Sequence, residues 1–426
     1  MTRAAAAAFF VCLALAPLAR AQVSGETWED PTLEAAVRDA DLIVLGECAA
    51  VGRAGGASYK VLRTFKGPAR DGREVAVVGL EMPGAAPGER PVAVGDRAYL
   101  LLRGTPTGPV LSVPTPTFGR FPVQSKGQVV ASFSDTFVRV GVPAARWERL
   151  IVALVSGAPD DALLAEARAA LQAKEPDATE AYVALELLAL FGQEADRALV
   201  EAALDHPAFA EPHRFRVRVA AVQALGHLGG GAAVERLLGL FERDPLEVVQ
   251  SAAAEALWPA LERHFVEDDR GARRACERLA ELALDARATP IRFGAANDPR
   301  ENERRGPLAA ALRTLGLLKA RAGIPPALRA LERESDGAAL VAGLLFFQEL
   351  GDPEQAGAIA WRMREPTAKD HYFNPLLSGA LEKLTGQRLG DERGPWVRWC
   401  RQRALLPAGP DAPLGGERPG GGGAPR

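Results

Sequence analysis

The feature that most constrains the fold is a spacing of apolar residues that recurs through the second half of the chain. Phe215, Val219, Val222, Leu225 and Leu228 follow one another at steps of four, three, three and three residues. This spacing places the five side chains on one face of a helix. After an LGGG turn, the same kind of spacing continues at Val234, Leu237, Leu238 and Phe241. The pattern therefore predicts a helix–turn–helix pair.

Similar pairs recur at intervals of about 30 to 37 residues. Leu318 and Leu350, which end two of the apolar stripes, lie 32 residues apart. Further copies of the helix pair are predicted at 184–204 and around 248–261. A degenerate copy is predicted after the one around 248–261. One pair cannot bury its own stripe, so neighbouring pairs must stack into a curved solenoid. An irregular helical bundle remains the alternative because the copies are degenerate, and 287–306 is expected to form a long loop that breaks the period.

This repeat resembles the short HEAT repeats of bacterial proteins over about residues 160–385. The resemblance implies an α-helical solenoid whose surface binds a protein or peptide. The segment ALEKLTGQRLGDERGPWVRWC, 380–400, is similar to the ends of exported HEAT-like arrays. We expect it to cap the solenoid, with Pro395 at the first helical position and with Trp396, Trp399 and Cys400 on one buried face. The rival interpretation of the paired tryptophans is an aromatic ligand cage.

In the earlier part of the chain, the hydrophobic pattern repeats every two residues instead. Tyr59, Val61 and Phe65 alternate with Lys60, Leu62 and Thr64, which is typical of a strand with one buried face. Further strands are predicted at 41–49, 74–78, 98–102 and 110–113, with at least one more within 127–140. Several short strands separated by close turns predict a small β-barrel or sandwich. The predicted fold class is thus α+β, with a β-barrel domain at 22–143 and a helical domain at 144–406.

The strand pattern AD-LIVLGE, then a strand ending FKG, then GDRAYLLLR, resembles bacterial relatives of the netrin and metalloproteinase-inhibitor type of OB-like barrel. The resemblance covers about residues 38–103 and extends more weakly into 118–130. In the inhibitors of that superfamily, a cysteine at the mature N-terminus chelates the zinc of the protease. Here no cysteine occurs between the expected mature start and Cys48, which argues against protease inhibition.

The first 21 residues read as a secretory signal peptide. Arg3 supplies the positive region, residues 4–18 form an apolar stretch, and Ala19-Arg20-Ala21 is a cleavage site of the A-x-A type. A membrane anchor would need about 20 apolar residues, whereas Pro17 and Arg20 interrupt this stretch. We therefore expect a soluble, exported protein, periplasmic or extracellular, that begins near Gln22 and is not inserted into the membrane.

Composition narrows the classes of partner. The chain carries 51 basic and 54 acidic side chains, and loss of Arg3 and Arg20 leaves a net charge of −5. A mildly acidic protein is a poor candidate for binding nucleic acid, whose phosphates require a dense cationic face. Residues 407–426 are rich in Gly and Pro with few apolar side chains, which predicts a disordered tail.

Three cysteines follow the signal segment, Cys48, Cys276 and Cys400. An odd, widely spaced set without CxxC predicts neither a disulfide framework nor a zinc site, and buried thiols are the simpler interpretation for at least two of them. The weak candidates for metal binding or acid–base chemistry are better explained as surface, loop or packing residues. They are His264 with Glu267 and Asp268, then Asp298 with Glu301 and Glu303, and His371 with Tyr372.

These observations leave no catalytic, cofactor-binding or metal-binding residue to name, and no cofactor is expected. We expect a non-enzymatic protein-binding or scaffold module that uses the solenoid surface. One alternative is an envelope inhibitory or structural module that acts through the barrel. Another is a lyase-type enzyme of the HEAT-like class that attaches bilin chromophores, although no cofactor-handling motif is found.

Overall fold

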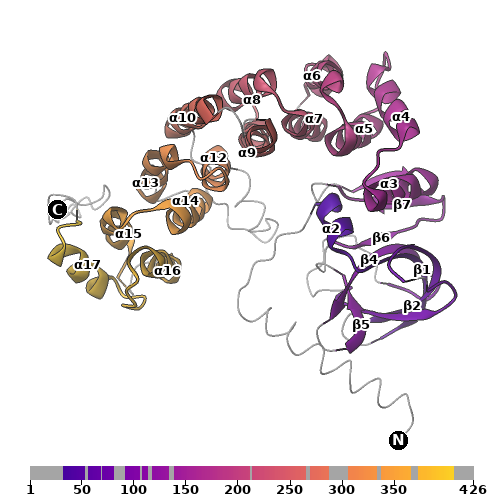
Figure 1. The fold of residues 1–426 in the computed structure, drawn as a ribbon, viewed down its shortest axis with the longest axis horizontal. Helices are drawn as coiled ribbons and strands as arrows, with labels where there is room; N and C mark the ends of the chain where they lie inside the picture. Colours follow the sequence, from indigo (N-terminus) through magenta and orange to yellow (C-terminus); the bar gives the residue numbers. More distant parts are fainter. Residues whose placement is uncertain are drawn as a thin grey trace, which may run out of the picture. The chain divides into compact units, whose positions relative to one another are not determined.

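The computed structural model describes residues 32–52, 56–68, 70–80, 92–105, 108–113, 118–133, 139–211, 214–264, 269–286, 306–332, 337–365 and 373–406. The expected signal segment and the expected disordered tail lie outside these residues. The chain divides into two compact units, residues 1–170 and 171–426. The first contains a β-barrel and the second is helical, so the predicted α+β fold class is confirmed (Figure 1).

The barrel closes through five strands. They are β1 (Leu42–Val51), β2 (Ala57–Lys66), β3 (Glu74–Val78), β4 (Arg97–Thr105) and β5 (Gly108–Ser112). Their order is β1-β2-β3-β5-β4, and β4 pairs back with β1. The β3–β5 pair is parallel, while the other pairs are antiparallel. This is a closed five-stranded barrel of the OB type, as predicted.

Alternation along the strands separates the barrel interior from its outer face. Tyr59 and Val61 are buried on β2, while Lys60 and Leu62 between them are exposed. The third residue of the predicted buried series, Phe65, is only partly buried. A strand with one face on a core requires this period, so the predicted pattern is confirmed over most of β2.

Four further elements complete the β part of the first unit. They are α2 (Leu33–Asp39), β6 (Arg120–Pro122), β7 (Gln128–Ala131) and β8 (Val140–Pro143). Strand β6 extends the barrel sheet by pairing with β4, whereas β7 and β8 pair only with each other in the sheets described. The strand expected within 127–140 is thus confirmed as β7. The sequence pattern predicted neither α2 nor β6.

Two helices follow the barrel within the first unit, α3 (Ala144–Ser156) and α4 (Asp161–Gln172). The predicted start of the helical part near Ala144 is therefore confirmed. Trp147 on α3 is fully buried, and its ring lies 4.9 Å from that of Phe121 on β6. Because this contact joins α3 to the barrel, the first compact unit continues past residue 143.

The second unit consists of helices wherever the structure describes regular secondary structure in it. They are α5 (Ala178–Phe191), α6 (Arg197–Leu204), α7 (Phe215–Leu228), α8 (Gly231–Arg243), α9 (Glu247–His264), α10 (Asp269–Asp285), α12 (Pro307–Leu317), α13 (Ile324–Glu332), α14 (Gly337–Leu350), α15 (Ala356–Arg362), α16 (Asn374–Thr385) and α17 (Arg393–Gln402). The predicted helix pairs at α7 and α8, α12 and α13, and α14 and α15 are confirmed.

These helices form two rows (Figure 1). In the first row, each helix packs against the next in the order α5, α7, α9, α12, α14, α16. In the second row, α8, α10, α13, α15 and α17 follow one another in the same way. Each pair in the sequence contributes one helix to each row, which buries the apolar stripe that a single pair would expose.

Ion pairs connect successive helix pairs at nearly constant sequence separation. Asp205 at the end of α6 pairs with Arg236 on α8, and Arg321 pairs with Asp352, 31 residues apart in both cases. Arg278 Nη2 on α10 lies 3.1 Å from Glu242 Oε1 on α8, 36 residues earlier. Ion pairs thus join successive helix pairs at separations close to the repeat interval, although each pair uses a different position on its helices.

The most buried of these contacts joins α7 to the turn before α9. Arg218 donates through both terminal nitrogens to Asp244, whose side chain is only 2% exposed. Asp244 also accepts from the backbone N–H of Leu246 at 3.0 Å. A bidentate arginine with a further backbone donor satisfies the buried carboxylate, so this pair orients the entry into α9.

The C-terminal helix α17, which the sequence predicts to be a cap, packs against α15. Trp396 and Cys400 are fully buried, and Trp396 Nε1 donates to the carbonyl of Gly390 at 2.7 Å. Trp399 is only partly buried, and the guanidinium of Arg403 lies 4.2 Å from its ring centre. The helix begins at Arg393, so Pro395 is its third residue and not its first. Proline is tolerated there because the first four N–H groups have no intrahelical acceptor.

Candidate functional site

The helical unit exposes large apolar side chains in one place. Among the residues that the structure describes in this unit, the exposed large apolar side chains all belong to first-row helices. They are Trp258 on α9, Leu317 on α12, Leu345 on α14 and Leu376 on α16, with 37 to 57% of each residue accessible. Single exposed apolar residues are common on protein surfaces, and here all four lie on helices of the same row.

One ion pair shows that α9 and α12 present these residues on the same side. Glu255 on α9 lies 3.9 Å from Arg313 on α12, so both side chains occupy the same surface. Trp258 follows Glu255 by three residues, and Leu317 follows Arg313 by four. Residues three or four apart share a helix face. Trp258 and Leu317 therefore lie on the side of the row that carries the Glu255–Arg313 pair.

The same argument places the residues of α14 and α16. Glu349 on α14 accepts a hydrogen bond from Lys383 Nζ on α16, and the lysine lowers the pKa of this carboxyl group. Leu345 precedes Glu349 by four residues, and Leu376 precedes Lys383 by seven, again on shared helix faces. We call the surface formed by the four apolar residues and the two ion pairs the open face of the first row.

Local packing explains why Leu345 is exposed on a helix that is otherwise almost wholly apolar. Helix α14 reads GAALVAGLLFFQEL, and Leu344, Phe346 and Phe347 around Leu345 are all buried. Neighbouring α12, α13 and α16 cover three sides of α14, which leaves one side for solvent. The exposed leucine is therefore a property of the two-row arrangement and not of the helix itself.

The three cysteines do not offer reactive chemistry. All three are buried, and none forms a disulfide. Burial raises the pKa of Cys276 and of Cys400 to about 11, and it also raises the pKa of Cys48. A protonated thiol is a poor nucleophile and a poor metal ligand, so the interpretation of these residues as packing residues is confirmed.

The weaker candidates from the sequence fall outside the described residues. This applies to Glu267 and Asp268, to Asp298, Glu301 and Glu303, to the side chain of His264, and to His371 and Tyr372. The loop predicted at 287–306 also falls almost wholly outside them. Within the described part of the chain, no group of three or more His, Cys, Asp or Glu side chains is arranged to hold a metal ion.

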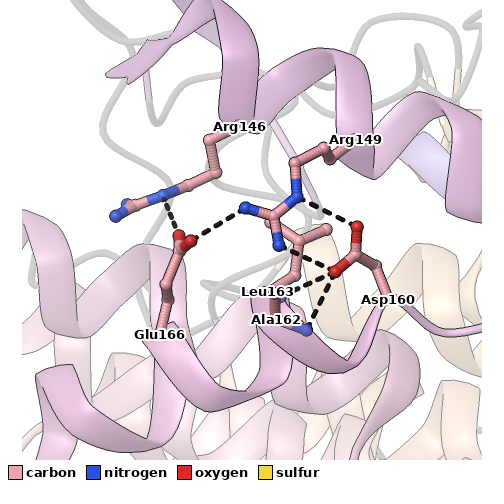
Figure 2. A network of polar contacts seen from close by, with 6 residues as sticks. All are labelled: Arg146, Arg149, Asp160, Ala162, Leu163 and Glu166. Carbon is pink, nitrogen blue, oxygen red and sulfur yellow. Dashed lines mark hydrogen bonds and ion pairs between the residues drawn. The ribbon is translucent and has the colours of Figure 1, made fainter.

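A polar network in the first unit joins α3 to α4 (Figure 2). Arg149 Nε and Nη2 donate to the two carboxylate oxygens of Asp160 at 2.9 and 2.7 Å. Glu166 accepts from Arg149 at 2.8 Å and from Arg146 at 3.2 Å. Asp160 also caps α4 by accepting from the N–H groups of Ala162 and Leu163. Every group in the network has a partner within it, so its role is to orient α4 and not to bind a ligand.

This network predicts a pH-dependent contribution to stability. The bidentate hydrogen bonds from Arg149 hold the pKa of Asp160 well below its usual range. A carboxyl group with a lowered folded-state pKa stabilises the fold fully above the unfolded value of about 3.9, and that contribution is lost progressively as the pH falls below it. We expect Asp160→Asn, which keeps the helix cap, to lower the free energy of unfolding by about 1 kcal/mol at neutral pH.

The measurement is urea unfolding followed by circular dichroism at several pH values. The difference between the wild type and Asp160→Asn should shrink as the pH is lowered below about 3.9. Asp160→Ala, which also removes the cap, should cost about 1 kcal/mol more than Asp160→Asn at every pH at which the protein folds. A difference between wild type and Asp160→Asn that stays constant with pH would contradict this assignment.

The open face was not identified from sequence, although a weak signal for it exists. Trp258 and Leu345 belong to apolar runs, ALWPAL and GLLFFQ, that are too continuous to show which residue faces solvent. An apolar stripe on one side of a helix leaves the opposite side polar, whereas an uninterrupted apolar run places apolar residues on both sides. An uninterrupted apolar run in a helix therefore predicts that some of its apolar residues are exposed to solvent.

None of the described helices is long and apolar enough to cross a membrane. In comparisons with known proteins, no family model matches this chain and no curated protein matches it.

Proposed function

We propose that this protein is an exported, non-enzymatic binding module that holds a protein or peptide on the open face of the first row. The observation that carries the proposal is the confinement of Trp258, Leu317, Leu345 and Leu376 to that face. Apolar residues flanked by charged pairs provide the apolar centre and polar rim that are typical of interfaces between proteins. Trp258 is the strongest single contact on this basis, because tryptophan is enriched among residues that dominate binding energy.

We further propose that the helical unit is a HEAT-like array and that the barrel is of the netrin and inhibitor type. Recurrent ion pairs at separations of 31 to 36 residues support a HEAT-like array, and the strand order supports a barrel of the netrin and inhibitor type. Export is proposed from the signal-like residues 1–21 alone. The alternatives, a barrel that acts as an inhibitor and a lyase-type enzyme, gain no supporting contact from the described residues.

The distance between neighbouring apolar residues on the open face indicates which secondary structure the partner segment has. Packed helices lie about 8–10 Å apart, so successive apolar residues on neighbouring first-row helices recur at about that interval. In an α-helix, residues seven positions apart lie about 10 Å apart along one side. We therefore propose a partner segment that is an amphipathic helix with apolar residues at positions i and i+7.

A displayed peptide library selected on the whole protein tests the proposal. Selected peptides should carry apolar residues seven positions apart, and should bind a Trp258→Ala, Leu345→Ser double variant at least about tenfold more weakly than wild type. The matched control is Leu62→Ser with Val152→Ser, which removes comparably exposed apolar residues from the first unit. Equal binding to wild type, double variant and control would refute the open face as the binding surface.

A further inference from the structure

Three exposed charged residues follow the apolar residues of the open face on α12, α14 and α16. Each lies toward the C-terminal end of its helix or just past it. They are Lys319 two residues after Leu317, Glu349 four residues after Leu345, and Lys383 seven residues after Leu376. We call these three charged residues the charged rim of the open face.

The members of the charged rim act on one another. Glu349 accepts a hydrogen bond from Lys383 Nζ, which lowers the pKa of its carboxyl group, and the charge of Lys319 lowers that pKa further. Helices α12, α14 and α16 follow one another in the first row (Figure 1). The charge along the rim is therefore positive, negative and positive, and the two lysines exceed the single carboxylate by one charge.

Apolar contacts alone do not fix the position of a helix that lies along the open face. A partner with apolar residues every seven positions can slide by seven residues and still place apolar side chains over most of the open face. Burial of apolar surface is non-directional, so it distinguishes poorly between these positions. A specific complex needs contacts that become unfavourable when the partner slides.

The charged rim provides such contacts. An acidic side chain of the partner is attracted by Lys319, and a second one, two steps of seven residues further along, is attracted by Lys383. A slide of seven residues moves one of these acidic side chains onto Glu349, where like charges repel. Complementary charges at the edge of an interface mainly determine specificity and position in this way, and add less to affinity.

We propose that the partner helix carries acidic side chains beside two apolar residues that are fourteen positions apart, and none beside the apolar residue midway between them. The three apolar residues then meet Leu317, Leu345 and Leu376, and the acidic side chains face the two lysines. This inference rests on the proposed function and names the chemistry of its partner.

Peptides selected on the whole protein from a displayed helical library test the proposal. The selected sequences should carry Asp or Glu beside two apolar residues fourteen positions apart, and neither beside the residue midway. The triple variant Lys319→Glu, Glu349→Lys, Lys383→Glu should bind these peptides about tenfold more weakly at low ionic strength, because attractive contacts become repulsive. The loss should shrink as salt is added, since exposed charges are screened.

The matched control is Arg243→Glu, Arg274→Glu, Glu277→Lys. It makes the same change of net charge at exposed positions of the second-row helices α8 and α10, and it should leave binding unchanged. A second rim variant, Glu349→Lys with Lys383→Glu, exchanges the two partners of one ion pair and keeps the net charge. It should weaken binding several-fold, which tests the rim even if the triple variant loses its helical circular dichroism spectrum.

The results separate this inference from the proposed function. Selected peptides without the acidic pattern, binding that is equal in wild type and both rim variants, or an equal loss in the control would each overturn the inference. The proposed function would still stand if the same peptides bind the Trp258→Ala, Leu345→Ser variant more weakly than wild type. A wild-type protein that selects no peptide would overturn both.

Discussion

Trp396→Ala is expected to lower the free energy of unfolding of the helical unit by about 3–5 kcal/mol. The indole has no exposed surface, so its removal leaves a cavity between α17 and the helices beneath it. The substitution also leaves the Gly390 carbonyl without the indole N–H that it accepts at 2.7 Å. Urea unfolding of the full chain, followed by circular dichroism at the helical minimum, measures the loss.

Two other tryptophans act as controls for this effect. Trp258→Ala removes an indole that is 37% exposed on the open face, and it should cost less than half as much. Trp399→Ala should fall between the two, because this ring is partly buried and covered by Arg403. Equal losses in Trp396→Ala and Trp258→Ala would show that α17 does not close the array. An unchanged stability in Trp396→Ala would show the same.

Trp147→Ala should have a comparable effect in the first unit, about 3–5 kcal/mol. The ring lies among three aromatic side chains, those of Tyr99, Phe121 and Phe133, with ring centres 4.9 to 6.4 Å away. These residues come from β4, β6 and the end of the β7 segment, so one side chain links α3 to three parts of the barrel sheet region. Near-UV circular dichroism during urea unfolding reports on this cluster.

Val152→Ala is the matched control on the same helix, because Val152 is 48% exposed and lies away from the cluster. It should change the free energy of unfolding by well under 1 kcal/mol. If Trp147→Ala unfolds α3 but leaves the barrel strands as stable as in the wild type, then α3 is not part of the barrel unit. The continuation of that unit past residue 143 would then be wrong.

The sequence predicted the long helices and strands because the residue spacing that identifies each of them lies within that element. Five apolar residues at helical spacing predicted α7 without reference to any other segment. Three of them, Val222, Leu225 and Leu228, are buried. The alternation of buried and exposed residues on β2 likewise lies within a single strand. Strand β6 was missed for the opposite reason, since the three residues Arg120–Pro122 are too few to show a period. Their strand conformation comes from hydrogen bonds to β4.

The open face and the contacts inside the barrel depended on segments that are far apart in the chain. In the run that contains Leu345, each neighbouring apolar residue is equally suited to solvent or core, and only the positions of α12, α13 and α16 decide which one is exposed. Arg120 on β6 and Tyr59 on β2 are separated by 60 intervening residues. They meet because β6 pairs with β4, β4 with β1 and β1 with β2.

The sequence by itself determined the order of the two units and the main helix pairs, because burial of apolar surface follows the period of the local backbone. The tertiary structure alone decided which apolar residues stay exposed and which polar groups become buried. Those properties depend on what covers each side chain, and the covering residues come from elements far apart in the chain.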